Sequence, residues 1–135
     1  MDTILLFLVE NLSFLYKDYG FRFIDSESTN SFGGDGYVSL EGNNMQIRIV
    51  SDRDQLFMEF RSISNDKKND WHTSDIIYQY LTSKIVGSSL LNKAAAISIR
   101  ENFDEICEIF HPRNAKKSIQ EFKKLELERS NRMFG

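Results

Sequence analysis

The sequence has little cysteine, proline or histidine: one Cys (Cys107), one Pro (Pro112) and two His in 135 residues. A single cysteine excludes an internal disulfide framework and fits a reducing compartment. Cys107 has apolar neighbours, which favours a buried thiol over a nucleophile. With His72 and His111 as the only imidazoles, no Ser/His/Asp or Cys/His arrangement can be argued.

Long hydrophobic runs are also absent. The apolar run at residues 4–9 is six residues long, follows Asp2 and precedes no small-residue cleavage site. We therefore expect no secretory signal, and no run has the length needed to span a bilayer. The prediction is a cytoplasmic protein with no membrane association.

The composition is that of a globular domain, with 41% hydrophobic and 27% charged residues, and eleven Phe and five Tyr predict an aromatic core. The length predicts one domain over residues 1–135. Residues 1–63 hold ten acids and five bases, whereas the remainder is basic by two charges. The acidic half disfavours nucleic acid as a partner and would steer a basic protein towards it. Soluble domains also carry such an imbalance by chance.

Residues 36–62 contain three alternating apolar and polar runs separated by two polar turns. Gly42-Asn43 supplies the positive φ angles of a tight hairpin turn, and residues 51–54 form the second turn. Because side chains alternate along a strand, one face of this antiparallel meander should enter the core. The predicted core residues are Val38, Leu40, Met45, Ile47, Ile49, Leu56, Met58 and Phe60. The opposite face is mixed and suits an open or protein-binding surface.

The remaining segments predict helices around this sheet. An apolar stripe through Leu5, Leu8, Val9, Leu12, Leu15, Tyr16 and Tyr19 predicts a helix over residues 2–19, with Gly20 as its C-terminal glycine. Residues 21–26 fit a short strand, followed by a loop over 26–36. Further helices are predicted over residues 72–84, 92–111 and 114–133, the last with a solvated, Lys/Glu-rich face and a frayed end. The fold class is α+β: an antiparallel β-meander of about four strands with one N-terminal and three C-terminal helices.

Motifs that carry chemistry are weak. Asp104, Glu108 and His111 share one helix face, but a di-metal site needs a second Glu-x-x-His motif, so a surface ridge is the better interpretation. Asp52 or Asp54 followed by Glu59 faintly matches a metal-dependent nuclease pattern. Arg61 stands there in place of the expected lysine, and a guanidinium cannot act as a base at neutral pH. We therefore predict no catalytic residue, no metal and no cofactor.

The opening of the chain carries a family resemblance. Residues 5–20 form an amphipathic helix that ends in Tyr-Gly, Phe21-Arg22-Phe23 follows, and the meander has the form Val-x-Leu, Met-x-Ile-x-Ile and Leu-x-Met-x-Phe. Over residues 5–62 the chain resembles small bacterial immunity proteins of toxin–immunity systems, including those of contact-dependent growth inhibition. The resemblance implies a non-catalytic protein that binds and blocks a cognate toxin domain, often a nuclease, in the cytoplasm. It transfers no binding residue, because such proteins differ at the toxin-facing surface.

If the resemblance holds, acidic residues would meet a basic toxin, with aromatic side chains as anchors. The predicted toxin-binding residues are Asp25, Glu27, Asp35, Tyr37, Glu41, Asp52, Asp54, Phe57 and Glu59. Two alternatives stay open. One is a small-ligand-binding or regulatory module with a pocket between sheet and helices, and the other is a metal-dependent enzyme built on Asp104, Glu108 and His111. The sequence does not predict the oligomeric state.

Overall fold

The computed structural model describes residues 2–28, 35–63 and 70–134 and confirms the α+β class. Two N-terminal helices precede the sheet: α1 (Asp2–Asn11) and α2 (Phe14–Lys17). The strands are β1 (Arg22–Ser28), β2 (Gly36–Gly42), β3 (Met45–Asp52), β4 (Gln55–Ser62) and the short β5 (His72–Thr73). The C-terminal helices are α3 (Ser74–Thr82), α4 (Lys93–Glu101), α5 (Phe103–Ile109) and α6 (Pro112–Phe134).

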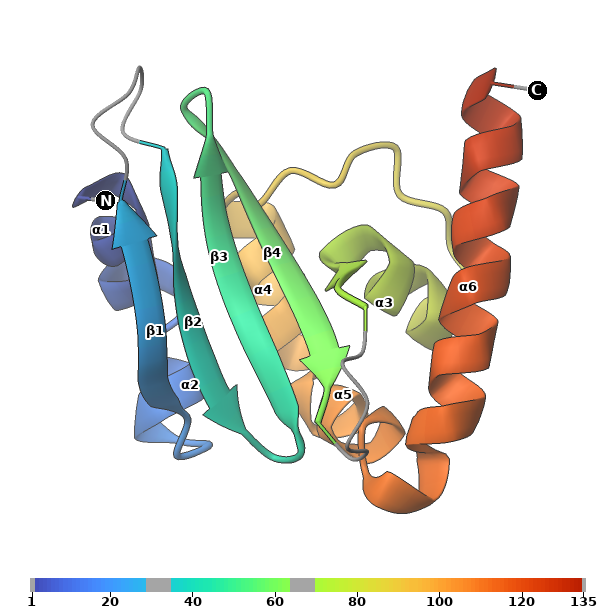
Figure 1. Ribbon diagram of the computed structural model, residues 1–135, viewed down its shortest axis with the longest axis horizontal. Coiled ribbons are helices and arrows are strands. Elements are labelled where there is room, and N and C mark those ends of the chain that lie inside the picture. Colours follow the sequence, from blue (N-terminus) through green and yellow to red (C-terminus); the bar gives the residue numbers. More distant parts are fainter. Residues whose placement is uncertain (1, 29–34, 64–69, 135) are drawn as a thin grey trace.

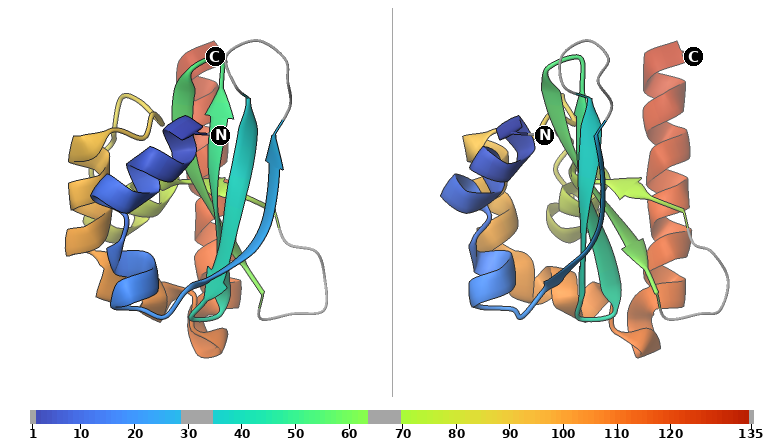
Figure 2. Two further views of the ribbon diagram at one scale, coloured as in Figure 1. Left: turned by 90° about the vertical axis from the view of Figure 1, so that its left-hand side faces the viewer. Right: turned by 60° about the vertical axis from the view of Figure 1, so that its left-hand side comes forward.

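The five strands form one antiparallel sheet in the order β1-β2-β3-β4-β5, so each strand pairs with its sequence neighbour (Figure 1). Helices α1, α2, α4 and α5 lie on one side of this sheet, and α3 and α6 flank its β4–β5 side (Figure 2). No described helix crosses the opposite face of β1–β4. One face of the meander is therefore packed against helices, and the other face is open.

The core lies between the sheet and the helical layer. All eight residues predicted for the inner face of the meander are buried, as the period-two pattern required. Phe103 extends this core at its lower end, where its ring meets the rings of Phe14, Tyr19 and Phe21 at 5.3, 4.5 and 5.7 Å between centroids. These rings form one aromatic cluster that joins α2, α5 and the residue before β1, and Phe110 makes a second set of ring contacts with Phe60 and Phe122.

The first hairpin turn is one residue later than predicted. The positive φ angles belong to Asn43 (47°) and Asn44 (65°), while Gly42 remains in β2 opposite Met45. A Cβ atom on Gly42 would lie 3.0 Å from the Phe21 ring, so this glycine serves close packing and not the turn. The second hairpin turns at Arg53 and Asp54, which have φ angles of 51° and 65°.

The predicted helix over residues 2–19 is two helices. α1 buries Ile4 and Leu8, and the chain turns before α2 buries Phe14 and Leu15. Because the helix axis changes direction between α1 and α2, the predicted apolar stripe does not describe the buried side of α1. Leu5 and Val9, which belong to that stripe, are 44% and 64% exposed. Gly20 has a positive φ of 70°, but α2 already ends at Lys17 with Asp18 as its C-cap, so Gly20 lies in the turn between α2 and β1 and is not the predicted C-terminal glycine of the helix.

The predicted helix over residues 92–111 also divides. Asn102 interrupts it with φ −105° and ψ 11°, and the Asn102 side chain donates to the Ser98 carbonyl at 2.8 Å. The interruption separates α4 from α5, and Phe103 at the start of α5 is fully buried. Pro112 is the first residue of α6, a position where proline costs no hydrogen bond.

The C-terminal half of α6 is docked by tertiary contacts and stays helical to Phe134, contrary to the predicted frayed end, while its outer face is exposed to solvent as predicted. Glu126 Oε2 lies 3.1 Å from Nδ1 of the buried His72, and Arg129 Nη1 donates to Thr73 Oγ1 and Asp75 Oδ2, both at 2.9 Å. On the exposed side of the helix, Lys124 lies 3.3 Å from Glu121, whereas Arg129 binds α3 and β5. The predicted helix over residues 72–84 begins instead with a short strand, β5, because His72 pairs with Phe60 of β4.

None of the helices in the described ranges is both long enough and apolar enough to cross a membrane.

Candidate functional site

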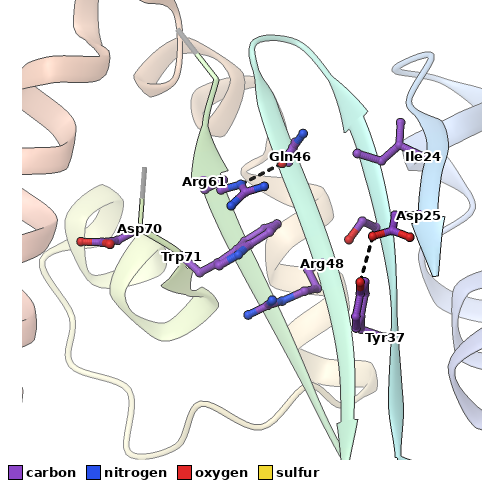
Figure 3. Close-up of a pocket in the computed structure, with 9 residues that line it drawn as sticks. Ile24, Asp25, Tyr37, Gln46, Arg48, Arg61, Asp70 and Trp71 are labelled. Carbon is purple, nitrogen blue, oxygen red and sulfur yellow. Dashed lines mark hydrogen bonds between the residues drawn. The ribbon is translucent and has the colours of Figure 1, made fainter. Parts of the chain in front are cut away.

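The open face of the sheet carries a groove of about 590 Å³. Its walls come from β1 to β4 and from the two residues that precede β5 (Figure 3). The lining residues are Ile24, Asp25, Tyr37, Ser39, Gln46, Arg48, Arg61, Asp70 and Trp71. We call this set the sheet-face groove. A concave surface lined by arginine and aromatic side chains is the strongest candidate site in the described part of the chain.

Trp71 forms the centre of the sheet-face groove. The guanidinium carbons of Arg48 and Arg61 each lie 4.4 Å from the centre of the indole ring. Figure 3 shows the indole between the two arginine side chains, which come from β3 and β4. Arg48 also lies 5.8 Å from the centre of the Tyr37 ring. Cation–π contacts of this kind hold two positive charges against one aromatic ring.

Hydrogen bonds across the strands fix both arginines. Arg48 donates from Nε to Oε1 of its cross-strand neighbour Glu59 at 2.8 Å, and their side chains are 28% and 20% exposed. Arg61 Nε donates to Gln46 Oε1 at 2.8 Å, and Gln46 Nε2 donates to Glu41 Oε1 at 2.9 Å. The register of β2, β3 and β4 places all of these residues on the same face. The donors of the groove are therefore held in place before any partner arrives.

A bulge in β1 shapes the other wall of the groove. The register shifts between Phe23 and Asp25, so Ile24 is an extra residue in the strand and lines the groove beside Asp25. The Asp25 carboxylate accepts the Tyr37 hydroxyl at 2.8 Å and the Ser26 backbone N–H at 2.8 Å. Because the neutral phenol donates to this carboxylate, the pKa of Tyr37 is raised above its ordinary value.

The nine predicted binding residues divide between two places. Asp25, Tyr37, Glu41 and Glu59 lie in or beside the sheet-face groove. Phe57 points to the same side of the sheet, since its register partner Val50 is also the partner of Tyr37. These five residues thus form one surface.

The other four predicted residues lie at one end of the sheet. Asp52 and Asp54 flank the turn between β3 and β4, and Asp35 Oδ1 accepts the Arg53 backbone N–H at 2.9 Å. Glu27 pairs with Tyr37 near the same end of β1. The structure therefore brings these acids together beside the groove but not inside it.

The local sequence pattern does not identify Arg48, Arg61 and Trp71 as groove residues. The two arginines fit the ordinary alternating charges of an open sheet face, and Trp71 follows a polar segment without periodicity. One available signal was that Trp71 is the only tryptophan of the chain, and a lone tryptophan in a polar linker must find an aromatic or cationic surface. The register that sets both arginines around it is not contained in the local sequence.

A metal site has no support among the described residues, where no group of three or more His, Cys, Asp and Glu side chains is arranged to hold an ion. Asp104 accepts the Tyr19 hydroxyl at 2.6 Å, and Glu108 accepts a hydrogen bond from Asn114 at 3.1 Å. His111 Nδ1 accepts the Arg113 backbone N–H at 3.2 Å. Each of these three residues thus has a hydrogen-bond partner among the described residues. Burial raises the pKa of the half-buried Cys107 thiol to about 11, which suppresses its thiolate.

A second cavity, of about 330 Å³, lies between α3, α4 and the segment that joins them. Its lining includes Tyr78, Leu90 and Ile99. Asp75 also borders it, with one carboxylate oxygen that is buried and has no hydrogen-bond partner among the described residues. This cavity lies between two helices and not between sheet and helices, where a ligand pocket was predicted.

Comparison of the chain with protein-family models, curated proteins and solved structures finds no significant match.

Proposed function

We propose that the protein is a non-catalytic immunity protein that binds a bacterial toxin domain through the sheet-face groove and blocks the active site of that domain. A toxin of contact-dependent growth inhibition with nuclease activity is the expected partner, and the cytoplasm is the expected place of binding. The single observation that carries the proposal is the Arg48–Trp71–Arg61 arrangement on an open sheet face. The resemblance of residues 5–62 to immunity proteins supplies the class of partner.

Tryptophan, tyrosine and arginine dominate the energy of protein interfaces because they bury large areas and lose little conformational freedom. The groove holds Trp71, Tyr37 and two arginines in fixed positions on strands, where preorganisation lowers the cost of binding. An open sheet face without such anchors would have only charged side chains to offer. The geometry therefore supports recognition of a protein surface.

The charges around the groove support a basic partner. Arg48 is already neutralised by Glu59, while Asp25, Glu27 and Asp70 add negative charge along the two sides of the face. The sheet end carries Asp52 and Asp54 in addition. A toxin that binds nucleic acid has a basic surface, so association with this face would be steered by charge.

The test of the proposal is co-expression with the toxin gene that neighbours the coding sequence, followed by purification of the complex. The wild-type chain should protect the cells and co-purify with the toxin domain. Trp71→Ala should weaken the complex by about 30-fold or more, the effect of removing an interface anchor. Affinity is measured by titration calorimetry, and melting temperatures of the free variants show that they remain folded.

Phe134→Ala is the matched control, because Phe134 is also aromatic, is 83% exposed and lies at the far end of α6. It should leave affinity unchanged. Cell death despite abundant folded wild-type protein would refute the proposal. Equal affinity of the Trp71→Ala and wild-type proteins would move the interface away from the groove.

The alternative is a small-ligand-binding or regulatory module. The 330 Å³ cavity between α3 and α4 favours it, because apolar walls beside one unpaired carboxylate oxygen suit a small ligand with a hydrogen-bond donor. A metabolite screen by thermal shift tests it. A ligand that raises the melting temperature of the wild-type protein but not of Tyr78→Ala would favour this function over toxin binding.

A further inference from the structure

The side of the helical layer that faces away from the sheet carries an apolar patch. Leu5, Leu6 and Val9 of α1 are 44%, 59% and 64% exposed, and Ile97 of α4 is 48% exposed. Helices α1 and α4 contact each other in this layer (Figure 2). The buried Ile4 and Leu8 point from α1 into the core, so Leu6 and Val9 belong to the outer side of the helix and Leu5 lies on its flank. We call these four residues the back patch.

Single exposed apolar residues are common on protein surfaces, but large ones that gather on two adjacent helices mark an interaction surface. The back patch belongs to helices on one side of the sheet (Figure 2), whereas the sheet-face groove is lined by residues of the opposite, open face of the strands. A partner bound at the groove would therefore leave it uncovered, and its role is separate from the proposed function.

The charges beside the back patch differ between the two helices. α1 carries the exposed acids Asp2 and Glu10 and no base. α4 carries the exposed bases Lys93 and Arg100, followed by Glu101 at its end. One half of the surface is thus acidic and the other half has a net positive charge, with apolar side chains between them.

We propose that the back patch is the interface of a homodimer in which α1 of one copy packs against α4 of the other across a two-fold axis. A two-fold axis presents the same surface from both copies, so the contact between an acidic α1 and a basic α4 occurs twice in the dimer. Packing of α1 on α1 would instead bring Asp2 and Glu10 of both copies together. An anionic membrane surface does not fit either, since α1 has no lysine or arginine to attract lipid headgroups.

The dimer should be weak. Stable interfaces bury about 800 Å² on each partner, and four partly exposed side chains with a charged rim fall below that area. We expect half-association in the micromolar range, so that the monomer–dimer equilibrium depends on protein concentration.

The test is sedimentation velocity on the full chain from about 1 µM to about 1 mM, a range that brackets a micromolar dissociation constant. The wild-type protein should shift from monomer to dimer. Leu6→Lys should keep it monomeric, since it places a charge in the apolar centre. Ile85→Lys is the matched control: Ile85 is 60% exposed, as Leu6 is 59% exposed, but it lies outside the patch.

Charge reversal tests the proposed orientation. One variant carries Asp2→Lys and Glu10→Lys, and the other carries Lys93→Glu and Arg100→Glu. Each variant alone should remain monomeric because α1 and α4 then have the same sign. An equimolar mixture should form a mixed dimer with about the wild-type dissociation constant, since both α1–α4 contacts regain opposite charges.

A wild-type protein that stays monomeric over the whole range would overturn the proposal, and so would dimers that persist in Leu6→Lys. A mixture that fails to associate, while the wild type does, would overturn the α1–α4 orientation. Binding of the monomer to vesicles of phosphatidylcholine and phosphatidylserine would assign the patch to a membrane instead. Toxin protection by Leu6→Lys is measured in parallel, so failure of the dimer and failure of the proposed function remain distinguishable.

Discussion

The side chain of Tyr19 joins the turn after α2 to α5. Its ring packs 4.5 Å from the ring of Phe103, and its hydroxyl donates to Asp104 Oδ1 at 2.6 Å. The hydrogen bond to the Asp104 carboxylate, together with burial, raises the pKa of Tyr19 to about 12. The neutral phenol is therefore the form that the folded state prefers.

Tyr19→Phe should lower the free energy of unfolding by about 1 kcal/mol at neutral pH, because it removes a hydrogen bond to a charged group. Since the folded pKa is raised, this stabilisation is complete below about pH 10 and is lost as pH rises towards about 12. Urea unfolding of both proteins between pH 7 and 11 measures the difference.

Tyr16→Phe is the control for this substitution, because the Tyr16 ring contacts Phe23 and its hydroxyl has no hydrogen bond with the described residues. A difference between the wild type and Tyr19→Phe that is the same at every pH would contradict the assignment of the hydrogen bond.

At the scale of elements, α6 is held to the domain by a polar network. Asp75 is almost fully buried, and Arg129 is its ion-pair partner at 2.9 Å. The neighbouring contact between Glu126 and His72 lies one helical turn away. These two polar contacts hold the second half of α6 against the domain, although its many charged residues would otherwise prefer solvent.

Arg129→Ala should destabilise the protein by about 1 to 3 kcal/mol, because it leaves the Asp75 carboxylate buried without a cation. Amide hydrogen exchange in residues 123–134 should become faster, since the end of α6 is released. Lys124→Ala removes the exposed pair with Glu121 and should cost about 0.5 kcal/mol or less. Unchanged exchange in Arg129→Ala would show that apolar contacts alone hold the helix.

The strands were predictable from sequence, whereas the helix boundaries were not. Alternation fixes the inner face of β2 to β4 because a strand has only two faces, and all eight predicted core residues are buried. The helix stripes gave no sign of the interruptions near Leu12 and at Asn102, because periodicity is a local average. The contacts of Glu126 and Arg129 depend on the position of α3, which no local pattern encodes.

At the scale of the whole molecule, three acids from the acidic half of the chain lie together at one end of the sheet. Asp52 and Asp54 lie at the tip of the β3–β4 hairpin, and Asp35 lies beside them. Charges at a tip extend furthest into solvent and act on an approaching partner before contact. The candidate surface was partly predictable for this reason, since net charge is read directly from sequence.

Asp52→Lys with Asp54→Lys should slow association with the proposed toxin partner by about tenfold at low salt and leave dissociation nearly unchanged. The effect should shrink as ionic strength rises, because salt screens exposed charges. Stopped-flow mixing measures both rate constants. Glu105→Lys with Glu128→Lys changes the net charge equally at exposed helical positions and should have less effect on the association rate.

An equal slowing by both pairs of substitutions would mean that net charge, and not the acidic end of the sheet, guides the encounter.

Trp71 has one further consequence. It is the only tryptophan of the chain and stands between two guanidinium groups in the sheet-face groove. Its fluorescence therefore comes from the candidate binding surface itself, with no contribution from the core. Any molecule that covers the groove would shift or quench this emission, so the unlabelled protein carries its own optical reporter of occupancy.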